Sequence, residues 1–188
     1  MADLSIDKRT TALVVIDLQK GITTIPTVHP MDGIVQRSAS LAEAFRRHGL
    51  PVVLVNVTGG APGRTETPGR FGTDPPPDWA DLVDDLHAQP EDILVTKQRW
   101  GAFHGTSLDA TLQELGVTQV VLTGVATSAG VESTARAAHE HGYHVVLAID
   151  AMTDREVDAH QHSIQRIFPK LGETAMTAEI LDMLERDR

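Results

Sequence analysis

The chain has 188 residues, of which 41% are hydrophobic and 22% charged, as expected of a globular domain with a sizeable core. It has no cysteine, which excludes disulfides and thiolate chemistry. Its net charge of −10 argues against nucleic acid and anionic membranes as partners, although such acidity can also simply favour solubility. There is no signal-peptide pattern and no apolar run long enough to cross a bilayer, so we expect a cytoplasmic protein.

Five short runs rich in Val, Leu and Ile predict strands. In chain order they are TALVVIDL (11–18), PVVLVNVT (51–58), DILVTKQ (92–98), QVVLTGV (119–125) and HVVLAID (144–150). Nearly continuous apolar strands are typical of a sheet that is covered on both faces.

Helical patterns alternate with these runs, over residues 33–49, 107–116, 130–142, 163–172 and 177–188. The first three end at Gly49, Gly116 and Gly142, and Pro169 interrupts the fourth. The alternation predicts one α/β domain over residues 1–188, with a doubly wound, mostly parallel sheet and helices on both faces.

The long irregular stretch 58–80 contains five glycines and five prolines, too many for the interior of a helix or strand. Loops of this length are often binding loops, but a surface excursion fits equally well. Arg64 and Arg70 within it could meet a carboxylate or could be solvated.

Two charged residues close predicted strands, Asp17 after LVVI and Lys97 after ILVT. Parallel α/β sheets bind ligands at the carboxyl ends of their strands. A charge at the end of an apolar strand is costly to desolvate unless it is paired. The two residues therefore predict either a site or a structural ion pair.

A third candidate is the strand-to-helix elbow, residues 124–130. The backbone amides near Ala129 and Gly130 would lie at a helix N-terminus, which favours a carboxylate or a developing oxyanion. Gly130 would let a ligand approach the backbone closely, or would merely permit a tight turn.

Three motifs together resemble the isochorismatase-like hydrolase family, also called the cysteine hydrolase family. They are TALVVIDLQKGI, VTKQRWGAFHGTSLD and TGVATSAGVESTARAAHEHGYHVVLAIDA, and they span nearly the whole chain in the family's order. The resemblance implies a Rossmann-like three-layer sandwich and a cis peptide between Val125 and Ala126. Because members of the family commonly form dimers or tetramers, it also implies a homo-oligomer.

The resemblance also implies an Asp–Lys–Cys triad that cleaves amides, with Asp17 and Lys97 at the first two positions. The third position is Gly130, so the nucleophile is missing. Ser128 lies two residues too early to replace the thiol. Isochorismatases proper also carry glycine there and cleave an enol ether by protonating its vinyl carbon. Asp17 would be the general acid, and Lys97 would bind the substrate carboxylate.

The remaining candidates are residues of the same motifs that could line the pocket. These predicted substrate-binding residues are Gln19, Arg99, Trp100, Phe103, Val125, Ala126 and Ala129. Core packing is an equally good interpretation of Trp100 and Phe103.

We expect no cofactor. The resemblance places a metal site of the amidases in the loop after the second strand, but no histidine lies between His48 and His87, so we expect no metal. The pairs His139/His141 and His160/His162 have the wrong spacing for a shared helical face and are predicted to be solvated.

Two functions remain open. The first is a cysteine-free hydrolase acting on a small carboxylated molecule. The second is a non-catalytic binding or assembly protein that has kept the fold and the pocket. Retention of Asp17 and Lys97 favours the first, and loss of the nucleophile favours the second.

Overall fold

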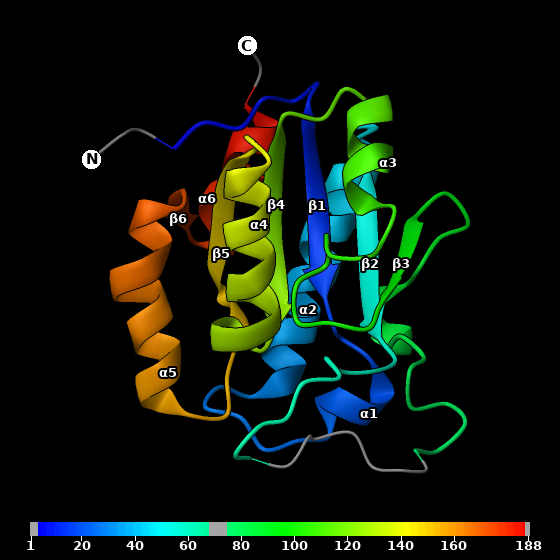
Figure 1. The fold of residues 1–188 in the computed structure, drawn as a ribbon. Coiled ribbons are helices and arrows are strands. Elements are labelled where there is room, and N and C mark those ends of the chain that lie inside the picture. The colour runs from blue at the N-terminus through cyan, green and yellow to red at the C-terminus, as the bar shows by residue number, and fades with distance from the viewer. Residues whose placement is uncertain (1–3, 68–74, 187–188) are drawn as a thin grey trace.

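In the computed structural model, which describes residues 4–67 and 75–186, the chain folds around a sheet of six parallel strands (Figure 1). The strands are β1 (Thr11–Ile16), β2 (Val52–Val57), β3 (Ile93–Lys97), β4 (Gln119–Val125), β5 (His144–Thr153) and β6 (Glu173–Ala175). Their order is β3-β2-β1-β4-β5-β6, so the chain begins in the middle and winds outward in both directions. In such sheets the crevice for ligands opens where the winding reverses, here between β1 and β4.

Helices cover both faces of the sheet. They are α1 (Lys20–Thr23), α2 (Met31–Arg47), α3 (Leu108–Glu114), α4 (Glu132–Glu140), α5 (Val157–His162) and α6 (Thr177–Glu185). In Figure 1, α3, α4 and α5 lie in front of the sheet, while α2 and α6 lie behind it. The predicted fold class, a doubly wound sheet between two helical layers, is confirmed.

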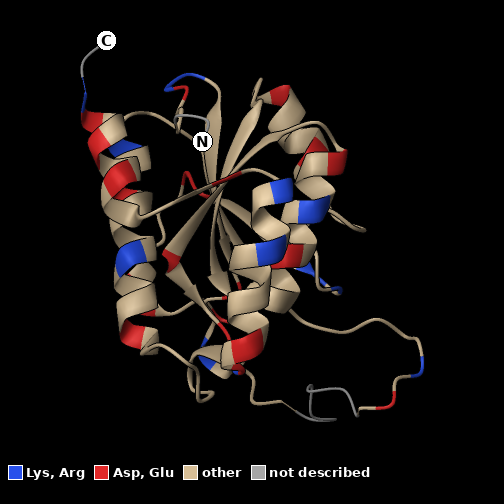
Figure 2. Ribbon diagram, turned by 90° about the vertical axis from the view of Figure 1, so that its left-hand side faces the viewer, with Lys and Arg blue, Asp and Glu red and all other residues tan. Residues whose placement is uncertain are grey.

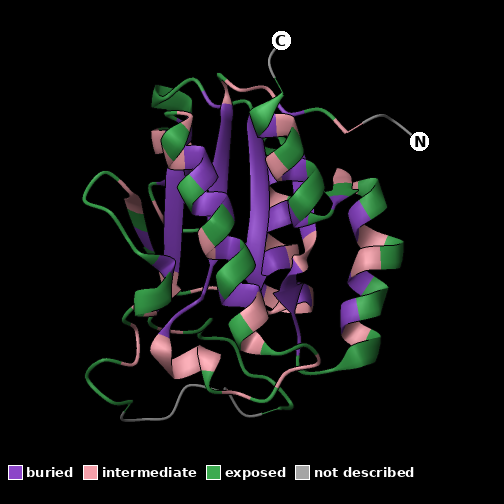
Figure 3. Cartoon of the chain, turned by 180° about the vertical axis from the view of Figure 1, so that it is seen from behind, coloured by how far each residue is buried: buried purple, intermediate pink, exposed green. Residues whose placement is uncertain are grey.

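The strands are buried because both of their faces contact helices. Every residue of β1 and of β4 is buried, and Figure 3 shows the central strands in purple between the helices. Alternate side chains enter two separate cores. Leu13 and Val15 pack with Phe45 of α2 on one face, whereas Val14 and Ile16 pack with residues such as Leu112 of α3 on the other.

Some boundaries differ from the sequence-based expectation. β6 and α1, three and four residues long, were not predicted, since so few residues carry no periodicity. The helix expected at 163–172 begins earlier, as α5, and continues through a π-helical turn (Ser163–Ile167) and a 3-10 turn (Phe168–Lys170). Pro169 is tolerated because it lies in the first turn of the 3-10 segment, where its missing N–H is not needed.

Charged residues of both signs lie mainly on the helices and loops (Figure 2). Asp17, Lys97 and Asp154 differ from this pattern, since each is at most 5% exposed. All three follow or end a strand at the carboxyl edge of the sheet. Among the described residues, no helix is long and apolar enough to span a membrane.

Candidate active site

Asp17 lies where β1 leaves the sheet. Its amide donates to the carbonyl of Val55 in β2 at 2.9 Å, and its backbone has a positive φ of 54°. This left-handed conformation is uncommon outside glycine, although aspartate is among the residues that adopt it. The chain therefore turns out of the strand at the residue that carries the buried carboxyl.

Lys97 is the last residue of β3, and β2 separates it from β1 in the sheet. Its ammonium donates to Asp17 Oδ2 at 2.7 Å and to the carbonyl of Arg99 at 3.1 Å. The two side chains are 1% and 7% exposed, so the pair is almost completely removed from water. The ion pair thus reaches across the end of β2.

The buried pair leaves one oxygen of Asp17 without a partner. Among the described residues, Asp17 Oδ1 is the buried side-chain oxygen or nitrogen that lacks a hydrogen bond. Burial raises the pKa of Asp17 from 3.8 to about 6, although the charge and hydrogen bond of Lys97 oppose the rise. Buried ion pairs contribute little to stability, and perturbed carboxyls in crevices are typical of functional sites.

The elbow completes the site. The Val125–Ala126 peptide bond is cis, as the resemblance implied, and the chain then forms a π-helical turn, Thr127–Val131, before α4. π-Helical turns occur frequently at functional sites. A Cβ placed on Gly130 would lie 3.2 Å from Asp17 Oδ2 and 3.0 Å from the carbonyl oxygen of Val125. The structure therefore brings Asp17, Lys97 and Gly130 together.

Residues after β5 hold the elbow from the other side. The Ser128 amide donates to Asp154 Oδ2 at 2.7 Å, and Thr127 Oγ1 lies 2.8 Å from His160 Nδ1. Asp154 was missed because the strand was expected to end at Asp150, whereas β5 continues through an irregularity to Thr153. The rule that identified Asp17 would have identified Asp154 had the strand end been placed correctly.

The prediction that both histidine pairs are solvated is wrong for His160. His160 is 5% exposed, whereas His139, His141 and His162 are exposed. Because α5 starts at Val157, His160 faces the elbow and also packs edge-on against His29, with ring centroids 4.8 Å apart. Burial, and then His29, lower the pKa of His160, while Asp154 opposes the shift.

Five of the predicted substrate-binding residues divide into three groups. Phe103 and Val125 belong to the two cores, and Phe103 stacks on His141 at 5.2 Å. Ala126 and Ala129 lie half-buried at the elbow, and the Ala129 amide donates to the Ala126 carbonyl at 3.0 Å. Gln19 is fully buried and hydrogen-bonds to backbone groups.

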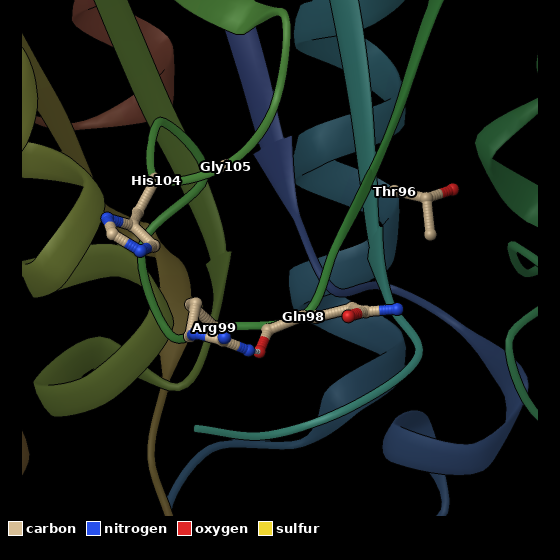
Figure 4. A pocket seen from close by; sticks show the side chains of 5 residues that line it. All are labelled: Thr96, Gln98, Arg99, His104 and Gly105. Atoms are coloured by element: carbon tan, nitrogen blue, oxygen red, sulfur yellow. Dashed lines mark hydrogen bonds between the residues drawn. The ribbon is translucent and has the colours of Figure 1, made fainter. Parts of the chain in front are cut away.

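Arg99 and Trp100 lie in the segment that follows Lys97. Trp100 is 66% exposed. The Arg99 guanidinium donates to the carbonyls of Gly60 and Gln98. It also lines a cavity of about 330 Å³ (Figure 4). The other lining residues are Thr96, Gln98, His104 and Gly105.

Of the long irregular stretch 58–80, the structure describes residues 58–67 and 75–80. Gly59 and Gly60 contact Gln98 and Arg99, and Arg64 is exposed. Arg70, also proposed to meet a carboxylate, lies outside the described residues. Within 4–67 and 75–186, no three His, Asp or Glu side chains are grouped so as to hold a metal ion.

Fold and site together define a Rossmann-like α/β domain with a buried acid–lysine pair beside its topological switch point. The chain belongs to the isochorismatase family, because residues 11–180 match the family's Isochorismatase domain. The family assignment from sequence motifs is thereby confirmed, and the chain falls in a family of hydrolases.

Three relatives illustrate the match. An uncharacterized isochorismatase family protein of Bacillus subtilis (strain 168), YwoC, is 39% identical over 98% of this chain and 100% of its own length. An isochorismatase family protein of Burkholderia thailandensis has a similar structure, with a TM-score of 0.91 and 41% identity over 97% of this chain and 98% of that one. Ureidoacrylate amidohydrolase RutB of Methylorubrum extorquens is 30% identical over 79% of this chain and 71% of its own length.

Proposed function

We propose that the chain is a cysteine-independent hydrolase that cleaves an enol ether of a small carboxylic acid, such as isochorismate, with Asp17 as general acid. One observation carries the proposal. The buried Asp17 carboxyl has one oxygen, Oδ1, with no partner among the described residues, and its other oxygen, Oδ2, lies 3.2 Å from where a Cβ on Gly130 would be. A carboxyl in this setting can donate a proton to a bound substrate, whereas glycine offers no group that could attack a carbonyl.

The proposed reaction needs one proton and one water. Asp17 donates its proton to the vinyl carbon, which leaves an oxocarbenium ion. Water adds to this ion and returns a proton to the Asp17 carboxylate. The resulting hemiketal breaks its carbon–oxygen bond and gives a ketone and an alcohol. A pKa of about 6 suits this task, because a general acid works best when its pKa lies near the operating pH.

Lys97 has two roles in this reaction. Its ammonium stabilises the Asp17 carboxylate that forms when the proton leaves, through the 2.7 Å contact. An ammonium has three N–H donors, and its bonds to Asp17 and to Arg99 leave one, as far as the described residues extend, for a substrate carboxylate. The cation therefore favours binding of an anionic substrate and favours proton transfer from Asp17.

A second candidate is a protein that binds a small carboxylated ligand without cleaving it. The observation in its favour is Gly130, which removes the nucleophile that the family resemblance places there. Binding would use the same Lys97 donor and the same unpartnered Asp17 oxygen. The two candidates differ only in whether Asp17 transfers its proton.

An assay of isochorismate and of ureidoacrylate hydrolysis tests the proposal. We expect the wild-type chain to cleave the enol ether and not the amide. Asp17→Asn should lower kcat by about 10²–10⁴-fold, the usual contribution of a general acid. Asp182→Asn, on the exposed surface of α6, is the matched control and should retain full activity. Full activity of Asp17→Asn would exclude the acid role, and ligand binding without turnover would favour the second candidate.

A further inference from the structure

Gln19 is a fully buried amide two residues after Asp17, and backbone groups bond to its oxygen and to both of its N–H donors. Its Oε1 accepts from the amide of Val57 at 2.7 Å. Its Nε2 donates to the carbonyl of Val57 at 3.1 Å and to that of Trp79 at 3.2 Å. Because Val57 N–H requires an acceptor and the two carbonyls require donors, these partners fix the orientation of the amide.

The two bonds between Gln19 and Val57 matter because Val57 lies between Asp17 and Lys97 in the sheet. Val57 is the last residue of β2, the strand over whose end the Asp17–Lys97 pair reaches. In the parallel ladder Val57 is the partner of Lys97, and the next amide, that of Thr58, donates to the Lys97 carbonyl at 3.0 Å. Gln19 therefore ties the end of β1 to the strand that positions Lys97.

The third bond reaches the far end of the long loop. Val57 precedes and Trp79 follows residues 58–78, so one side chain joins backbone groups on both sides of this segment. The Trp79 carbonyl also accepts from the amide of Gly21 at 2.9 Å. The Trp79 ring lies so close that a Cβ at Gly21 would come within 2.0 Å of it. Only glycine fits at position 21.

We propose that Gln19 is a positioning residue of the candidate site. Its amide fixes the end of β2 between β1 and β3 and thereby holds Lys97 opposite Asp17. It also joins Val57 to Trp79 and so fixes the two ends of the long loop relative to each other. This inference goes beyond the proposed function and rests on it only in treating the Asp17–Lys97 pair as the site. It also replaces the expectation that Gln19 contacts substrate.

A second buried glutamine provides a matched control at the opposite edge of the sheet. Gln119 is 6% exposed and begins β4. Its Oε1 accepts from the amide of Asp7 and the hydroxyl of Thr11, and its Nε2 donates to the carbonyl of Ser5. The two glutamines thus make the same kind of bonds, but only Gln19 lies beside the site.

The test is the reactivity of Lys97 toward an acylating reagent such as acetic anhydride, measured by mass spectrometry of the folded protein. The chain has four lysines, and Lys97 is 2% exposed whereas Lys170 is exposed. We compare wild type, Gln19→Met and Gln119→Met, since methionine keeps the size of the side chain and removes its hydrogen bonds. Lys170 acts as the internal standard.

We expect Gln19→Met to raise the acylation rate of Lys97 about tenfold, which corresponds to about 1.4 kcal/mol or roughly one net hydrogen bond, with Lys170 unchanged. Gln119→Met should leave both rates within about twofold of wild type, since its bonds lie at the far edge. If Gln19→Met does not fold, Gln19→Asn keeps the amide on a shorter side chain that cannot reach all three partners, and it should also raise the Lys97 rate with Lys170 unchanged. An unchanged Lys97 rate, or an equal rise in both methionine variants, would overturn the proposal.

This measurement needs no substrate, so it separates the positioning role from the proposed reaction. If the wild-type chain cleaves isochorismate, we expect Gln19→Met to lower kcat/KM about tenfold and Gln119→Met to leave it within about twofold. If the wild-type chain cleaves nothing, the acylation result still decides whether Gln19 positions Lys97.

Discussion

The two edges of the sheet are built in different ways. At the amino edge, α2, α3 and α4 each end in a glycine with positive φ, namely Gly49, Gly116 and Gly142. A Cβ at each of these would meet no described atom within 4 Å. They are ordinary helix ends in which glycine supplies only its backbone freedom.

The carboxyl edge departs from this regularity in several places. A non-glycine residue, Asp17, has a positive φ, and the elbow passes through a π-helical turn. Buried charges gather here, and a Cβ at Gly130 would be crowded rather than free. The comparison teaches that glycine serves chain reversal at one edge, whereas at the other edge it lets the elbow pack closely against Asp17 and Ile16.

The largest expected effect is the loss of turnover in Asp17→Asn described above. The next largest is a loss of stability in Lys97→Met. Removing the cation leaves a buried carboxyl without its partner, which costs about 3–5 kcal/mol of unfolding free energy. Urea denaturation followed by circular dichroism at pH 8 measures it. Lys170→Met, at an exposed position, should change the free energy by less than about 0.5 kcal/mol. Equal losses of unfolding free energy in the two variants would mean that the buried ion pair at the carboxyl edge contributes no more than an exposed lysine.

The pH dependence of stability tests the same buried pair. Because the folded-state pKa of Asp17, about 6, lies above its ordinary value of 3.8, the folded state binds more protons between these pH values. This contribution to stability is fully present below about pH 4 and is lost as the pH rises through about 6. We expect wild type to lose about 2–3 kcal/mol relative to Asp17→Asn over this window. Parallel pH profiles of the two proteins would contradict the raised pKa.

Gly130→Cys makes the carboxyl edge more like the triad of the family. The new Cβ would lie 3.0–3.2 Å from Ile16, Val125 and Asp17, so neighbours must shift by a few tenths of an ångström. We expect a loss of about 1–2 kcal/mol and reduced enol-ether cleavage, because the added atoms fill the space beside Asp17. Weak ureidoacrylate hydrolysis should appear if Asp17 and Lys97 are the other two residues of the triad, as the family resemblance implies. Unimpaired enol-ether cleavage would show that the space at Gly130 is not used.

The smallest effect is expected at the amino edge. Gly116→Ala places a side chain at a φ of 68°, which costs about 1 kcal/mol although the surrounding space is open within the described residues. Thermal unfolding measures the loss, and the kinetic constants should not change. A change in kcat or KM would contradict the view that the amino edge has no part in the activity.

Much of the fold and the centre of the site follow from local patterns. Asp17 and Lys97 could be predicted because each ends an apolar run, and the carboxyl ends of parallel strands share one edge. The interpretation of Gly130 as the position of the family's nucleophile could not be made from local patterns and came from the family resemblance. The single domain over 1–188, the cytoplasmic location and the oligomeric state stay predictions.

The remaining parts of the site depend on contacts between distant segments. His160 meets the elbow only because α5 begins six residues before the helix that the sequence pattern predicts. Gln19 could be recognised as polar but not as buried, because its partners lie 38 and 60 residues away. Hydrophobic periodicity carries no information about such pairings.

The strand order also has a consequence for how the chain folds during synthesis. β1 is made first, yet it lies at the centre of the sheet, and its partner β4 begins 108 residues later. At about 5–20 residues per second, the ribosome needs roughly 5–20 s to deliver that partner. During this interval one edge of a mostly apolar strand stays unpaired, which makes the nascent chain prone to aggregation. Asp17, Lys97 and Gly130 can therefore meet only after about two thirds of the chain has emerged.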